Sequence, residues 1–100
     1  MKKGAVLVFD RQVLMRQTQE DVRLASEVLE LFFAHLSRLE KADWNHLKLS
    51  LEMHTLQGAA ASVGATQIEE LSASWRAQGE QLAVKLQDAS RAFRAAAQTF

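Results

Sequence analysis

The chain has 100 residues, of which 48% are hydrophobic and 24% charged, and its twelve basic residues balance its twelve acidic ones. This length predicts one domain over residues 1–100, because a chain of this size buries roughly two-thirds of its unfolded surface. The neutral balance argues against nucleic acid or an anionic membrane as a partner. No run approaches the roughly 18 apolar residues of a membrane span. The lack of cysteine excludes disulfides and thiolate chemistry and fits a cytoplasmic protein.

The first nine residues contain an apolar run (5–9) with strand propensity. The chain offers no second strand-like run to pair with it, and a lone strand is not stable. We therefore expect an extended or helical lead-in that lies on a helical bundle. Asp10 can then cap a short helix over about 11–17, with Val13 and Leu14 facing the core.

The longest predicted helix runs from about Thr18 to Lys41. Thr18 is the candidate N-cap, because Asp21 follows it three residues later in a pattern close to a capping box. Apolar residues at intervals of three and four then predict a core-facing stripe of Val22, Ala25, Leu29, Phe32, Leu36 and Leu39. Three more apolar residues widen the stripe toward a second neighbour: Val28, Leu31 and Phe33.

The central predicted helix begins after Asp43, its candidate N-cap, and ends at Gly64, which suits the left-handed position after a helix. His54 lies about 140° around this helix from the core-facing residues. Gly58 follows one turn later, although glycine costs about 1 kcal/mol in a helix interior relative to alanine. This pattern indicates close approach either by another molecule or by a neighbouring helix. The core-facing residues are Leu49, Met53, Leu56, Ala60 and Val63.

The last part of the chain predicts two more helices. Thr66 and Glu69 form a capping-box pattern that opens a helix to Gln78, with Gly79 at its end and Ile68, Leu71 and Trp75 facing inward. The final helix spans roughly 81–98, with core-facing Leu82, Leu86, Ala89, Phe93 and Ala97. Four long amphipathic helices with short connections predict an all-α, antiparallel up-down-up-down four-helix bundle, with the short N-terminal helix or the extended lead-in covering one end.

The segment from His54 to Gly64, HTLQGAAASVG, resembles the signature of histidine-containing phosphotransfer (HPt) domains, in which His-x-Leu-Lys-Gly precedes small residues and a second glycine. The resemblance extends from about Phe9 to the last helix. It implies that His54 carries a phosphoryl group to or from aspartates of response-regulator receiver domains, and that a sensor (hybrid) histidine kinase is a further partner. It also implies no kinase activity and no bound cofactor, with Mg²⁺ on the receiver.

Gln57 departs from the family, which usually has a lysine there that places positive charge beside the phosphoryl group. The amide of Gln57 can donate a hydrogen bond to a phosphoryl oxygen, but it brings no charge. Arg76, on the next predicted helix, stands where the family often has Gln or Glu near the histidine. It is therefore a candidate to supply the missing charge.

The chemistry of the residues agrees with this resemblance. An imidazole accepts a phosphoryl group near neutral pH, because its ordinary pKa is about 6.5. Small neighbours, Gly58 and Ala61, would admit the rim of a partner's pocket. The predicted docking surface also includes Leu47, Ser50 and Leu51, although the two leucines are equally compatible with core contacts on a second face of the helix.

The other histidines, His35 and His46, show no metal-ligand spacing with another histidine, a cysteine or a carboxylate, so we predict no metal site. Two function classes follow from the sequence. The first is a monomeric phosphorelay carrier. The alternative is a degenerate, non-phosphorylated module that docks a receiver or kinase domain through the same face. An enzyme with its own turnover is disfavoured, because no nucleophile–base pair is visible.

Overall fold

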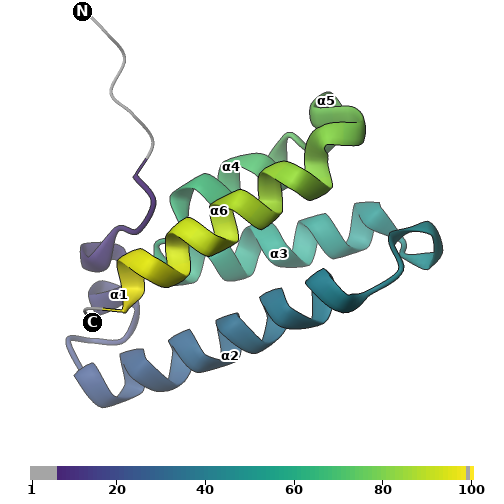
Figure 1. The fold of residues 1–100 in the computed structure, drawn as a ribbon. Helices are drawn as coiled ribbons and strands as arrows, with labels where there is room; N and C mark the ends of the chain where they lie inside the picture. Colours follow the sequence, from purple (N-terminus) through teal and green to yellow (C-terminus); the bar gives the residue numbers. More distant parts are fainter. Residues whose placement is uncertain (1–6, 99) are drawn as a thin grey trace, which may run out of the picture.

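The structure, a computed structural model, describes residues 7–98 and 100 (Figure 1). Every regular element in this part of the chain is helical, which confirms the all-α prediction. No helix in it is both long and apolar enough to cross a membrane. The elements are α1 (Arg11–Gln17), α2 (Val22–Lys41), the 3-10 helix η1 (Trp44–His46), α3 (Leu49–Val63), α4 (Thr66–Ala73), α5 (Trp75–Gln78), the 3-10 helix η2 (Gly79–Gln81) and α6 (Leu82–Ala97).

The helices pack around a core with aromatic side chains near its centre. Phe93 of α6 is fully buried and meets Phe32 of α2 edge to face, with ring centroids 5.3 Å apart. Phe9, just before α1, meets Phe93 in the same way at 5.4 Å. The described end of the lead-in therefore packs on the bundle in a non-helical conformation, whereas its start, residues 1–6, lies outside the described part. Figure 1 shows the end of α6 beside α1.

The core stripes predicted for α3 and α6 are confirmed almost completely. Every predicted position on α6 is buried, and so is every one on α3 except Leu49, which is half-buried. Two predictions for α2 are wrong, because Val22 is 51% exposed and Leu31 is 72% exposed. Val22 is the first residue of α2, and Leu31 lies a helical step to one side of buried Phe32.

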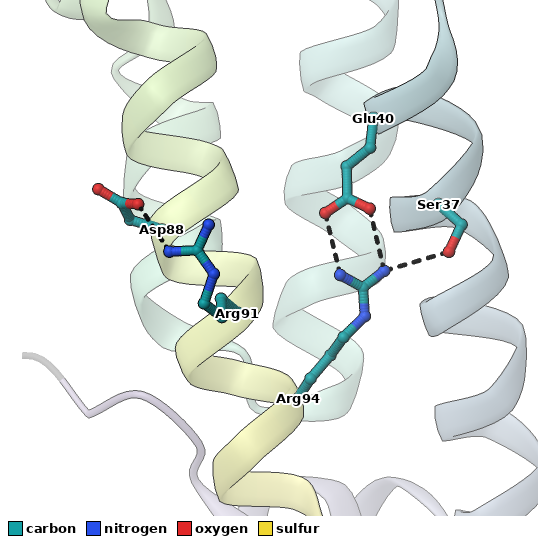
Figure 2. Close-up of polar contacts among 5 residues, drawn as sticks. All are labelled: Ser37, Glu40, Asp88, Arg91 and Arg94. Atoms are coloured by element: carbon teal, nitrogen blue, oxygen red, sulfur yellow. Dashed lines mark hydrogen bonds and ion pairs between the residues drawn. The ribbon is translucent and has the colours of Figure 1, made fainter.

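A polar clamp joins α6 to α2 at the edge of the core (Figure 2). Arg94 places Nη1 2.9 Å from Oε2 of Glu40 and Nη2 3.3 Å from Oε1, so the carboxylate is held at both oxygens. The same Nη2 donates to Oγ of Ser37 at 3.1 Å. One turn earlier on α6, Arg91 pairs with Asp88 of its own helix, at 3.2 Å, and both side chains are exposed.

The N-cap predicted for α2 is wrong by three residues. Thr18 closes α1 instead, and its buried hydroxyl donates to the carbonyl oxygen of Leu14 at 2.9 Å. Asp21 caps α2, accepting from the backbone N–H of Leu24 at 3.1 Å. Gln19 and Glu20, between them, adopt positive φ angles of 54° and 63°, so the chain turns sharply before α2 begins.

The N-cap predicted for α3 is also wrong. Asp43 caps η1, accepting from the backbone N–H of Asn45 at 3.0 Å. The indole of Trp44 donates to the carbonyl oxygen of Leu39 at 2.9 Å, which fixes η1 on the end of α2. Because η1 intervenes, α3 begins only at Leu49 and has no side-chain cap.

The helix predicted over 66–78 is divided at Ser74 into α4 and α5. The hydroxyl of Ser74 donates to the carbonyl oxygen of Glu70 at 2.8 Å and accepts from the side-chain amide of Gln78 at 2.9 Å. Such bonding of a serine to the preceding turn competes with regular helix geometry. The capping box is wrong as well, since Ala65 holds the N-cap position and Thr66 is already helical.

Candidate functional site

His54 lies in the middle of α3 with its imidazole exposed. With a step of about 100° per residue, it shares one face of the helix with Leu51, Thr55, Gly58 and Ser62, all of them exposed. The side chain of His54 forms no hydrogen bond or ion pair with any other residue that the structure describes. The imidazole is therefore free to react with a group brought by another molecule.

Gly58 leaves the helix surface bare one turn beyond His54. A Cβ placed on Gly58 would meet nothing within 4 Å, so no other described helix needs this glycine for close packing. This removes the interpretation of Gly58 as an internal packing residue. The hydroxyl of Ser62 donates to the Gly58 carbonyl oxygen at 3.1 Å, so this side chain is bonded to the backbone of its own helix. The bare surface is open to a bulky partner.

Gln57 lies about 60° around α3 from His54, by the same helical step, and is half-buried. Its side chain has no hydrogen bond to the rest of the described chain. The amide is thus uncommitted and sits within one turn of the imidazole, as the sequence predicts. Ala61, on the same side of the helix, is half-buried too.

Arg76 is exposed on α5, and its guanidinium carbon lies 5.0 Å from the centroid of the Trp75 ring. This stacking is a cation–π contact, and no ion pair competes with it in the part of the chain described. The structure does not record a contact between Arg76 and His54. Among the described residues, no cation is therefore bonded to the imidazole.

The predicted docking residues have different environments. Ser50 and Leu51 are exposed in the first turn of α3, and Leu51 is 60% exposed. Leu47 lies before α3, at the end of η1, and packs half-buried against the core. Leu47 lies outside the central helix, contrary to the prediction, because η1 shifts the start of α3 to Leu49. Of the two leucines, only Leu51 is therefore a surface residue.

His35 and His46 differ from His54 in their surroundings. Nε2 of His35 is buried without a hydrogen-bond partner among the described residues. Burial lowers the pKa of His35 below 6.5, Arg38 lowers it further, and Glu52 opposes the shift. His46 is exposed, with Nε2 3.4 Å from Oδ2 of Asp43.

Sequence reasoning missed two features near the site. Thr55 and Ser62 share the exposed face of His54, and their helical spacing from it was a usable signal. Arg38 of α2 pairs with Glu52 of α3 at 3.2 Å, two residues before His54. Nothing in the sequence pattern pairs two charges 14 residues apart on different helices.

The chain matches the family model described as Hpt domain over residues 11–99, which covers α1 to α6. No curated protein and no solved structure matches it. Hpt domains carry phosphoryl groups in two-component signalling, interact with response-regulator receiver domains and histidine kinases, and are not kinases themselves. With its helical bundle and this match over nearly its whole length, the chain belongs to the Hpt domain family.

Proposed function

We propose that this protein is a phosphorelay carrier that accepts a phosphoryl group on His54 and passes it to or from the aspartate of a receiver domain. The supporting observation is the exposed imidazole of His54, which has no partner within the described chain and stands one turn from the bare surface at Gly58. A donor phosphate sits in another protein's pocket, so the imidazole must be exposed and a residue beside it must be small enough to admit the rim of that pocket.

In the transfer, one ring nitrogen of neutral His54 attacks the phosphorus of the receiver's aspartyl phosphate. The N–P bond forms as the O–P bond breaks, the aspartate leaves as a carboxylate, and the other ring nitrogen keeps its proton. The reverse step regenerates the neutral imidazole. Such transfers depend mainly on positioning and on stabilising the charge of the phosphoryl oxygens. The Mg²⁺ that contributes charge belongs to the receiver.

The domain's own contribution to the phosphoryl oxygens comes from Gln57 and Arg76. Gln57 has an uncommitted amide within one turn of His54. His54 lies nine positions before the last residue of α3, Val63, and Trp75 lies nine positions after the first residue of α4, Thr66. An antiparallel pair of helices would therefore place His54 at about the level of Trp75 and of Arg76, the next residue. Release of Arg76 from the Trp75 ring would bring its charge toward the phosphoryl group.

Docking uses the surface around His54, which we assign to Ser50, Leu51, Gly58 and Ala61. The short connections between successive helices support an up-down-up-down order for α2, α3, α4–α5 and α6. This order turns the exposed face of α3 outward along its whole length. One face of one helix then suffices for the reaction, which is why we propose a monomeric carrier.

The decisive experiment is labelling with purified receiver domains charged by acetyl phosphate, followed by an assay for acid-labile phosphate. Wild type should be labelled, and His54→Ala should not be. His35→Ala and His46→Ala are the matched controls and should be labelled like wild type. Labelling that persists without His54, or that disappears in either control, would assign the reaction elsewhere.

The second candidate function is a non-phosphorylated docking module. Two observations favour it: no cation of the described chain is bonded to His54, and Gln57 replaces the family's lysine. This function predicts that a receiver binds the domain while no donor labels it. The labelling experiment combined with a receiver-binding titration therefore separates the two functions.

A further inference from the structure

A cavity of about 210 Å³ lies between α2, η1, α3 and α6. Its apolar walls are formed by Leu36 and Leu39 of α2, Trp44 of η1, Leu56 of α3 and Leu86 of α6. The cavity reaches α3 only at Leu56, which is buried in the core, whereas His54 faces solvent. It is therefore separate from the phosphotransfer site, and the carrier function does not explain it.

Ser90 of α6 is the buried polar residue of the cavity lining. Three polar residues of the described chain are buried, and two of them, Thr18 and Ser72, donate to the carbonyl oxygen four residues earlier, at 2.9 and 2.7 Å. The third, Ser90, is 2% exposed, and its hydroxyl has no hydrogen-bond partner within the described structure. A buried hydroxyl without a partner is unfavourable, so a molecule in the cavity that bonds Ser90 gains from this contact.

The lining offers a ligand no unpaired charge. Its charged residue is Glu40 of α2, and Arg94 of α6 holds both oxygens of this carboxylate (Figure 2). The exposed lining residues on α6 are Ala83 and Gln87, which are neutral. A charged ligand would lose hydration without meeting an opposite charge, which is costly. The lining therefore favours a neutral molecule.

We propose that this cavity binds a small, neutral aromatic molecule with one hydrogen-bonding group, its ring against the leucines and Trp44 and its polar group on the Ser90 hydroxyl. An apolar cavity of about 150 Å³ holds benzene, so this larger one admits a bicyclic ring. The indole of Trp44 is held in place, since its Nε1 donates to the carbonyl oxygen of Leu39 at 2.9 Å. It presents a fixed aromatic surface to the ligand.

Indole itself is the test ligand, because it is a neutral bicyclic molecule with one N–H group. It is titrated into the ¹⁵N-labelled domain, and the indole N–H signals of the two tryptophans are followed by NMR. The signal of Trp44 should shift with a Kd on the order of 0.1–1 mM, as expected for a ligand of about nine heavy atoms. Trp75 of α5, outside the cavity lining, is the internal control. No shift at Trp44 in about 5 mM indole, or equal shifts of both tryptophans, would overturn the proposal.

The role of Ser90 is tested with indene, which has nearly the same shape as indole but no N–H group. Indene should bind wild type roughly fivefold more weakly, because it forms no hydrogen bond. Ser90→Ala should bind both ligands equally, within about twofold. Ser72→Ala, which removes a buried serine outside the cavity, is the matched control and should keep the wild-type preference. A preference for indole that persists in Ser90→Ala would contradict the assigned hydrogen bond.

The location of the site is tested by closing the cavity from its exposed side. Ala83→Phe should weaken indole binding by about tenfold or more, and the domain should stay folded because residue 83 is exposed. Val84→Phe, at the next position of α6 and outside the lining, is the matched control and should change the Kd by less than about twofold. Unchanged binding in the folded Ala83→Phe variant, or equal losses in both variants, would overturn the site. These measurements involve no phosphoryl transfer, so their failure leaves the carrier function intact.

Discussion

The backbone N–H of Asp10 donates to the carbonyl oxygen of Gly64 at 2.7 Å. This bond ties the start of α1 to the end of α3, where Gly64 adopts φ = +76° and its own N–H donates to the carbonyl oxygen of Ala60. A Cβ on Gly64 would collide with the carbonyl oxygen of Asp10. Glycine is required at this position both for its conformation and for the close approach of another segment.

Gly64→Ala should therefore destabilise the domain by about 2–4 kcal/mol, because it combines a strained left-handed residue with a backbone clash. Urea denaturation followed by far-UV circular dichroism measures the change. Gly58→Ala is the matched control, since it meets open space in a helix interior and should stabilise by about 0.5–1 kcal/mol. A loss of less than about 0.5 kcal/mol in Gly64→Ala would contradict the observed packing.

A longer side chain at Gly58 should separate stability from function. Gly58→Gln should keep the stability of the domain or raise it slightly, because glycine is the poorer helix former. It should slow phosphotransfer from a receiver, because the side chain occupies the path to His54. Stopped-flow or quench-flow labelling measures the rate. Unchanged transfer in the folded variant would show that the bare surface is not needed for access.

Gln57→Lys should speed acceptance by His54, or lengthen the phosphohistidine lifetime, by about five- to tenfold. A hydrogen bond to a charged partner contributes about 1 kcal/mol more than a neutral one, and this difference corresponds to that factor in rate. The gain should shrink in high salt, because the site is open to solvent. Gln57→Glu is the control of opposite charge and should slow transfer.

Arg76→Ala tests whether the domain already supplies that charge. If Arg76 leaves the Trp75 ring for the phosphoryl group, Arg76→Ala slows transfer and Gln57→Lys adds little to wild type. Trp75→Phe keeps an aromatic face for the guanidinium and serves as the control. If the transfer rate is unchanged in both Arg76→Ala and Gln57→Lys, neither residue takes part in the mechanism.

The lowered pKa of His35 predicts a pH-dependent stability. Because the folded pKa lies below the unfolded value of about 6.5, the unfolded chain binds more protons between the two values. The contribution of His35 to stability is therefore complete above about pH 6.5 and is lost as the pH falls below it. Urea titrations at pH 7.5 and 5.5 should show a smaller difference for His35→Leu than for wild type. His46→Leu, at an exposed site, should retain the wild-type difference.

The clamp between Arg94 and Glu40 should contribute measurably to stability, because it is bidentate and only about one-third exposed. Arg94→Ala should cost about 1 kcal/mol, a value below that of a buried charged pair because solvent screens it. Arg91→Ala should stay within about 0.5 kcal/mol, since its pair with Asp88 is exposed and within one helix. Equal effects of the two variants in urea denaturation would show that the clamp adds nothing.

The sequence alone determined where most of the chain is helical and which sides of α3 and α6 face the core. It also determined that His54 lies opposite the α3 stripe and that Gly64 ends α3. These features follow from the spacing of apolar residues and from the backbone freedom of glycine. Both are local properties of the sequence, so they can be recognised without knowing how the helices pack. The same local spacing led to the motif from His54 to Gly64 and hence to the family.

Only the tertiary structure decided which helix each capping residue serves. Thr18, Asp43 and Thr66 all have capping chemistry, but the turns around them set their backbone angles, and those turns depend on how the helices meet. It also decided that Leu31 stays exposed, because the neighbours that could cover a widened stripe are distant in sequence and do not reach it. The burial of the His35 nitrogen likewise needs α3 beside α2, which no pattern within α2 contains.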